Sequence, residues 1–211
     1  YLYNERAAER AYRRYPDLKL VIILRDPVDR LFSHYLHMRR MGDEPLSLSS
    51  ALKAEPLRRA RGYGPSYHYL SQGFYKAQIE RFVTRAGWEK TKIVLFDDLV
   101  KDPISTVQSI YGFLGVSDRF LPPVDEVHNA FYEPRLRAID ELVMGRSTLK
   151  RIARAALPDR LRTQGANLLR ALNAAPKPKL DPAIREELKR LYRAEIEALE
   201  RYLDRDLSAW Y

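Results

Sequence analysis

Residues 19–35 read KLVIILRDPVDRLFSHY, and this stretch decides the fold. Residues 20–24 are too few for a helix and rich in branched aliphatic side chains, which predicts a strand buried on both faces in a parallel sheet. Pro27 suits the first turn of a helix, and the Asp26 carboxylate can accept hydrogen bonds from the free N–H groups there. We therefore expect Arg25 at the carboxyl end of a central strand, where open α/β sheets bind their ligands.

Ser33 follows about two turns into the predicted helix. A guanidinium and a hydroxyl can grip a phosphate between them, so Arg25 and Ser33 together indicate anion binding. Arg30 lies on the same helix and has two open interpretations. It could reach the same phosphate, or it could form a buried ion pair with Asp97 or Asp98 at the end of a neighbouring strand.

Strand and helix patterns alternate along the first half of the chain. We expect a strand over residues 18–24, a second aliphatic strand over 92–96, and helices over 4–15 (capped by Asn4), 27–40, 46–59, 74–86 and 103–114. This alternation is consistent with parallel strand order. Later helices are expected over 136–143, 147–156, 159–173 and 182–203. The prediction is one α/β domain, with a core portion at 1–116 and a mainly helical remainder at 117–211.

The pattern R-D-P-x-x-R-x-x-S-x-Y after an aliphatic strand resembles the 3′-phosphate-binding motif of sulfotransferases that use 3′-phosphoadenosine 5′-phosphosulfate (PAPS). Later segments resemble the same family in order and spacing. QGFY at 72–75 is similar to its G-x-Y helix start, and KIVLFDDL at 92–99, Asp-Pro at 102–103 and FLGV at 113–116 are similar to its strand, E-D-L, D-P and F-L-G-V sequence. Residues 203–210 resemble the close of bacterial and carbohydrate-modifying members.

The resemblance implies a P-loop-NTPase-like parallel sheet flanked by helices and incomplete at the N-terminus. It also implies transfer of a sulfuryl group from PAPS to a hydroxyl, or second to an amine, of an acceptor, with 3′-phosphoadenosine 5′-phosphate (PAP) as the product. No metal is needed. The bacterial-looking end and the lack of cysteine favour a prokaryotic enzyme acting on a saccharide or lipid-linked glycan, while a small phenol or alcohol stays open.

Four residues form the cofactor-binding set that the resemblance implies. Arg25 and Ser33 fall on the positions that bind the 3′-phosphate in the family. Tyr75 lies near where some members contact the adenine, and an aromatic face suits a purine, although packing in the core is the alternative. Lys177, with Lys179, lies where related enzymes place a basic loop over the 3′ side of the cofactor, and a solvated loop is its alternative.

The family's P-K-x-G-T-T loop, which cradles the 5′-phosphosulfate, has no counterpart here. No glycine precedes Gly42, and residues 1–4 resemble the P-x-Y-L that enters the helix before the R-D-P strand. We therefore expect a sulfotransferase domain truncated at its N-terminus and inactive alone. Its catalytic residues stay unassigned, because they are expected in the missing segment.

The four histidines give no catalytic or metal assignment. His34 and His37 are three residues apart on one predicted helix, but no third ligand with suitable spacing accompanies them. We expect them on a solvated helix face. His68, in an aromatic loop, and His128, beside Asn129, could each contact an acceptor substrate.

Composition limits the remaining classes of function. The 37 Lys and Arg against 28 Asp and Glu give a formal charge of +9, which favours anionic ligands. The chain has no cysteine, so a disulfide framework and a thiolate metal site are excluded. No apolar run approaches the roughly 20 residues that cross a bilayer, and a cytoplasmic location is expected.

Three other functions stay open besides sulfuryl transfer. A P-loop kinase would share the sheet and the anion chemistry, but it needs a G-x-x-x-x-G-K loop that this chain lacks. A nucleic-acid-binding module would use the basic charge, although we expect no nucleic acid as a partner. A non-catalytic helical interaction protein is the third.

Overall fold

The computed structural model describes residues 1–123, 165, 168, 169, 172, 173, 176 and 178–211. The chain divides into two compact units, one formed by Tyr1–Glu126 with Leu180–Tyr211 and the other by Val127–Lys179. The helices expected over 136–143 and 147–156 lie outside the described residues, and that over 159–173 is described only at isolated positions. The account below concerns the first unit.

Two parallel strands form the sheet of the described residues. They are β1 (Leu20–Leu24) and β2 (Thr91–Leu95), aligned so that Leu24 lies opposite Leu95. The expected strands and their parallel order are confirmed. The expected burial of β1 on both faces is wrong at one position, because Ile22 and Leu24 are buried while Ile23 is 51% exposed. Successive side chains of a strand point to opposite faces, so the described residues cover the face of Ile22 and leave Ile23 open.

Helix α2 (Pro27–Met41) follows β1 directly, as expected from the sequence. The Asp26 side chain accepts hydrogen bonds from the N–H groups of Val28 at 2.7 Å and Asp29 at 3.0 Å. At the other end Gly42 adopts a left-handed conformation with φ of 83°, which a residue with a Cβ atom rarely does. The strand, turn and helix around Arg25 are thus fixed by local signals.

Four other expected helices are present in this unit with small changes of boundary. They are α3 (Leu48–Ala60), α4 (Tyr75–Ala86), α6 (Pro103–Leu114) and α10 (Pro182–Leu203). Helix α1 (Ala7–Arg14) is also present, but Asn4 is not its cap: the helix begins three residues later, and the Asn4 side chain accepts from the Arg6 N–H instead. A short helix that the sequence analysis missed, α5 (Phe96–Lys101), starts at the end of β2.

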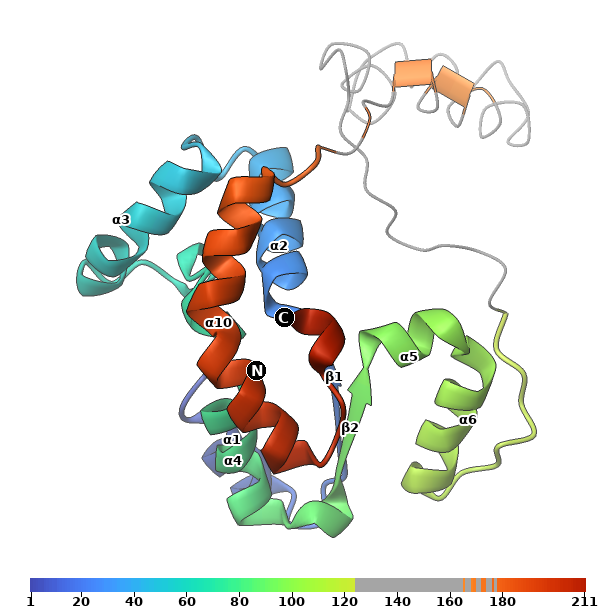
Figure 1. The fold of residues 1–211 in the computed structure, drawn as a ribbon. Coiled ribbons are helices and arrows are strands. Elements are labelled where there is room, and N and C mark those ends of the chain that lie inside the picture. The colour runs from blue at the N-terminus through green and yellow to red at the C-terminus, as the bar shows by residue number, and fades with distance from the viewer. Residues whose placement is uncertain (124–164, 166–167, 170–171, 174–175, 177) are drawn as a thin grey trace, which may run out of the picture. The chain divides into compact units, whose positions relative to one another are not determined.

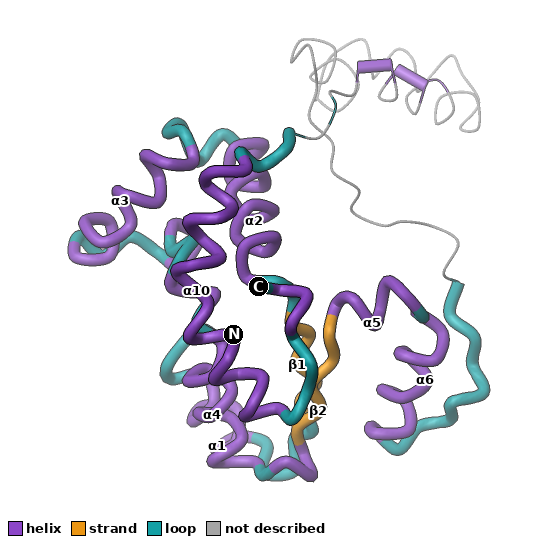
Figure 2. Tube along the Cα trace, viewed as in Figure 1, coloured by secondary structure: helices purple, strands orange, loops and turns teal. Residues whose placement is uncertain are grey.

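Helix α10 brings the end of the chain back to the sequence-distant α2 and α4. It lies beside both helices and contacts them (Figure 1). Its buried residues are Leu188, Tyr192, Ile196 and Leu199. After α10 the chain returns to the sheet, as the tube in Figure 2 shows, and the buried Trp210 donates from its indole N–H to Asp97 at 3.0 Å. The C-terminal segment therefore braces the start of α5. None of the helices described has the length and apolar character to cross a membrane.

Candidate functional site

Arg25 lies where the two parallel strands end, as the sequence predicts. It follows Leu24 of β1, and its guanidinium lies 5.0 Å from the centroid of the Phe96 ring, which follows β2. The side chain is 30% exposed and approaches the Asp29 carboxylate at 3.7 Å. A cation over an aromatic face is attracted by the ring, so Phe96 helps to hold the guanidinium at this edge. Arg25 is therefore held at the ends of the strands, and its guanidinium is still accessible to a ligand.

Tyr75 lies behind Arg25 and binds its main chain. The Tyr75 hydroxyl donates to the Arg25 carbonyl at 2.9 Å, and the side chain is buried, with 5% of the residue exposed. Burial raises the pKa of Tyr75 to about 12, so the hydroxyl keeps its proton at physiological pH. The structure gives Tyr75 a supporting contact with Arg25, and the adenine contact inferred from the resemblance stays a prediction.

A second guanidinium reaches the same edge from the distant helix α10. Arg185, in the first turn of α10, binds one oxygen of Asp29 at 2.8 Å, while the other oxygen faces Arg25. One carboxylate is therefore shared by two cations, while the neighbouring Asp26 carboxylate accepts from the first turn of α2. The two guanidiniums at this edge are the groups that could bind an anion. No local pattern in the sequence marks Arg185, because the pair joins residues 156 positions apart.

The other residues expected to bind the cofactor are either exposed or outside the described residues. Ser33 is exposed on α2, and Lys179 is exposed before α10. Lys177 lies outside the described residues. The structure therefore puts Arg25 and Ser33 on consecutive elements, and the roles of Ser33 and Lys177 stay predictions.

The Arg30 side chain binds neither of the two aspartates, Asp97 and Asp98, that the sequence suggested as its partners. Its guanidinium donates to the main-chain carbonyl of Tyr69, and its Nε atom is buried without a hydrogen-bond partner in the structure. The two aspartates proposed for an ion pair are occupied elsewhere: Asp97 accepts from Trp210, and Asp98 pairs with Arg205 at 2.7 Å. The ion-pair interpretation of Arg30 is therefore wrong in this structure.

His34 is not on a solvated face, contrary to expectation. It is half-buried, with its ring centroid 5.1 Å from that of Tyr69 in an edge-on arrangement. Burial, then the charges of Arg30 and His37, lower the pKa of His34 to about 4, so the ring is neutral at pH 7. His37 is exposed, as expected.

The remaining histidines are divided between described and undescribed residues. His68 lies between two tyrosines: its Nδ1 atom is 2.9 Å from the Tyr3 hydroxyl, and its Nε2 atom is 3.0 Å from the Tyr63 carbonyl. Because a carbonyl only accepts, Nε2 carries the proton and Nδ1 accepts from Tyr3. His128 and Asn129 lie outside the described residues. Within the described ranges, no group of three His, Cys, Asp or Glu side chains is arranged to hold a metal ion.

Comparisons with known proteins indicate the family of this chain. The family model described as "Sulfotransferase family" matches residues 2–119. The human bifunctional heparan sulfate N-deacetylase/N-sulfotransferase 3 is 29% identical over 119 residues, which are 55% of this chain and 14% of that protein. The mouse N-deacetylase/N-sulfotransferase 4 is 28% identical over 125 residues, which are 57% of this chain and again 14% of that protein.

A solved structure extends the likeness over the whole chain. The crystal structure of a sulfotransferase from Alicyclobacillus acidocaldarius superposes with a TM-score of 0.72 and 30% sequence identity, covering 100% of this chain and 64% of that one. This likeness confirms the expected α/β fold of the P-loop-like class. The chain spans a small part of the curated relatives and less than two thirds of the solved one. Since the family match includes more than half of its residues, the chain belongs to the sulfotransferase family.

Proposed function

We propose that this protein serves in sulfuryl transfer from PAPS to a hydroxyl or amine of a saccharide acceptor. The observation that carries the proposal is the position of Arg25, a partly exposed cation at the carboxyl ends of two parallel strands, within the region matched by the sulfotransferase family. The comparisons give no support to the kinase, nucleic-acid-binding or non-catalytic alternatives.

In this proposal Arg25 and Ser33 hold the 3′-phosphate of the cofactor. Arg25 contacts Asp29 at 3.7 Å, a longer distance than a charge-assisted hydrogen bond, so a phosphate can offer it a shorter contact. Ser33 has an exposed hydroxyl on the helix that starts two residues after Arg25. Tyr75 would form the floor under this site, and Lys177 stays a candidate from the sequence alone.

These residues orient the cofactor and do not perform the transfer. A base on the enzyme would take the proton of the acceptor, while positive groups stabilise charge on the transferring group and on the leaving oxygen. Binding the 3′-phosphate fixes the cofactor for an in-line approach, which is a contribution of positioning. No described residue is assigned as the base.

A saccharide acceptor is proposed from the curated relatives. Those proteins are named as heparan sulfate N-sulfotransferases, which act on a polysaccharide and at nitrogen. Their similarity supports both a sugar acceptor and the amine option for this protein. Assaying a panel of sugar acceptors with labelled PAPS would identify which sugar is the substrate.

The test is equilibrium binding of PAP to the wild-type chain and to single variants. Arg25→Ala should weaken PAP binding by at least about 2 kcal/mol, because a charge-assisted contact is lost, and Ser33→Ala by about 1 kcal/mol. Arg39→Ala is the matched control, since Arg39 is an exposed cation in the last turn of α2. Unchanged PAP affinity in Arg25→Ala would remove Arg25 from the site, and tight binding of ATP without binding of PAP would favour a kinase.

A further inference from the structure

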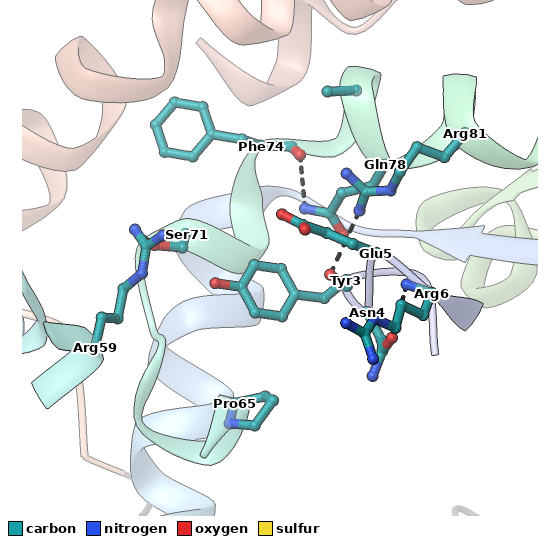
Figure 3. A pocket seen from close by; sticks show the side chains of 11 residues that line it. Tyr3, Asn4, Glu5, Arg6, Arg59, Pro65, Ser71, Phe74, Gln78 and Arg81 are labelled. Carbon is teal, nitrogen blue, oxygen red and sulfur yellow. Dashed lines mark hydrogen bonds between the residues drawn. The ribbon is translucent and has the colours of Figure 1, made fainter. Parts of the chain in front are cut away.

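A pocket lies away from the strand ends, between the start of the chain and α4. It has a volume of about 640 Å³ and is lined by residues from the N-terminal segment, the last turn of α3, the turn before α4 and the first two turns of α4. Figure 3 shows Arg59 on one side of the Tyr3 ring and Arg6 and Arg81 on the other. The pocket therefore gathers three guanidinium groups, from α3, from α4 and from the residue just before α1.

The three arginines have no carboxylate partner within the described part of the chain. Arg6 is exposed, and Arg59 donates from Nη1 to the Ser71 hydroxyl at 3.0 Å. Arg81 donates from Nη2 to the Leu2 and Tyr3 carbonyls at 3.2 and 3.4 Å, and its Nε atom is buried without a partner. These contacts orient the guanidiniums and leave their charges uncompensated by a direct ion pair.

Two carboxylates lie near this pocket and reduce its charge without cancelling it. Glu5 lines the pocket and is exposed, with no ion pair to the arginines. Glu55 lies behind the wall, 2% exposed, and accepts hydrogen bonds from the Leu70 and Ser71 N–H groups and from the Ser71 hydroxyl. Three cations against two carboxylates, one of them engaged in the wall, leave a pocket that favours an anion.

The pocket also has an aromatic wall. The Tyr3 ring lies between the arginines, with its hydroxyl bound to His68. Phe74 also lines the pocket and is 38% exposed, with its ring centroid 5.3 Å from that of Tyr192. An aromatic face offers apolar surface to the C–H groups of a sugar ring, while a planar guanidinium binds a sulfate or carboxylate through two parallel hydrogen bonds. The two kinds of wall together suit an acidic sugar better than a bare inorganic ion.

We infer that this pocket binds an acidic sugar unit, through a sulfate or carboxylate group that the three guanidiniums hold. The inference rests on the proposed function, because it names the acidic class of saccharide that the enzyme takes. The pocket and the proposed cofactor site flank the first turn of α4: Phe74 lines the pocket, and the next residue, Tyr75, binds the Arg25 carbonyl. The two sites use different arginines, so one can be removed without the other.

The test titrates the wild-type chain with sucrose octasulfate, with sucrose as the neutral probe and inorganic sulfate as the ion without a sugar ring. The sulfated sugar should bind, sucrose should not, and inorganic sulfate should bind at least about tenfold more weakly. Arg6→Gln and Arg59→Gln should each lower the affinity about threefold to tenfold, and Glu5→Gln should raise it. Equal binding of sucrose, or of inorganic sulfate, would overturn the inference.

Arg10→Gln is the matched control variant. Arg10 is exposed one turn after Arg6 on α1 and does not line the pocket, so this change removes the same charge nearby and should leave the affinity unchanged. If Arg10→Gln weakens binding as much as Arg6→Gln, the sulfated sugar is attracted by the overall positive charge of the protein, and the proposed site is refuted. Melting temperatures report whether each variant is folded. Glu5→Gln should strengthen binding, so its result cannot be explained by a variant that fails to fold.

Titration of the same variants with PAP separates this inference from the proposed function. PAP affinity should be unchanged in Arg6→Gln and Arg59→Gln, and binding of the sulfated sugar should be unchanged in Arg25→Ala. If PAP binds but the sulfated sugar does not, the pocket proposal fails alone. If the sulfated sugar binds through Arg6 and Arg59 but PAP does not bind, the cofactor proposal fails while this pocket still binds an acidic sugar.

Discussion

The Tyr75 hydroxyl donates a hydrogen bond of 2.9 Å to the main-chain carbonyl of Arg25, joining the first turn of α4 to the end of β1. The carbonyl belongs to the residue between the strand and the cap of α2, so no sheet or helix partner satisfies it. A buried side chain does so instead. The main-chain position of Arg25 therefore depends on a tyrosine 50 positions later.

Tyr75→Phe should lower the free energy of unfolding by about 1 kcal/mol and weaken PAP binding a few-fold. The change keeps the buried ring and leaves the Arg25 carbonyl without its partner. Chemical denaturation and PAP titration measure the two effects. Tyr67→Phe is the control, because the Tyr67 hydroxyl makes only an exposed bond of 3.4 Å to the Asp43 carbonyl. Full PAP affinity in Tyr75→Phe would show that the bond does not position Arg25.

Local signals were enough to predict the element that carries Arg25. A short aliphatic run, Asp26 as a cap and Pro27 at the first helical position all act within a few residues, and the structure has each of them in place. The same kind of signal failed at Asn4, which competes for a nearby N–H in the turn before α1. Helix α5 was missed because it is only six residues long and follows a strand without a break.

The contacts around the site could not be read from the sequence. Asp29 and Arg185 meet because α10 packs against α2, and nothing local to either residue records that packing. Likewise, Glu44 and Glu55 look like solvated acids in a polar stretch, yet each is 2% exposed. Their burial depends on partners supplied by the fold, including Arg58 for Glu44 and the turn before α4 for Glu55.

Asp29→Asn should strengthen PAP binding about threefold while lowering stability by less than about 1 kcal/mol. The change removes a negative charge shared by Arg25 and Arg185, so both guanidiniums face the anion with less competition. The Asp29 side chain is 37% exposed, which keeps the stability effect small. Weaker PAP binding would instead mean that Asp29 is needed to orient Arg25.

The matched control for this change is Asp17→Asn. Asp17 also pairs with a cation, Lys90, at 2.9 Å, but its side chain is 95% exposed, and it lies before β1 at the opposite end of the strand from Arg25. PAP affinity should not change in this variant. A similar gain in both variants would indicate a change in net charge alone.

Glu44→Gln should destabilise the protein by about 3 kcal/mol or more, as expected when one partner of a buried ion pair is removed. The Glu44 side chain is fully buried and binds Arg58, the Tyr69 hydroxyl and the Leu46 N–H. Burial alone would raise the pKa of Glu44, but these hydrogen bonds, led by that of Arg58, outweigh it and lower the pKa. Urea denaturation at pH 7 measures the loss.

An exposed pair provides the comparison for Glu44. Glu197→Gln removes the partner of Arg193 on α10, where the side chains are 41% and 70% exposed, and should change stability by less than about 0.5 kcal/mol. If the two variants lose similar stability, the buried position of Glu44 is not what makes its ion pair important.

His34→Gln should remove a pH dependence of stability between about pH 6.5 and pH 4. The folded protein lowers the pKa of His34 from 6.5 to about 4, so in this window the unfolded chain binds the proton more readily. Stability therefore falls as the pH falls, by about 1–2 kcal/mol after allowance for the partial exposure of the ring. Urea denaturation at pH 7 and pH 4.5 should show this loss in the wild type and in His37→Gln, whose ring is exposed. An equal loss in His34→Gln would assign the effect to other groups, and an NMR titration of His34 with a pKa near 6.5 would contradict its burial against Tyr69.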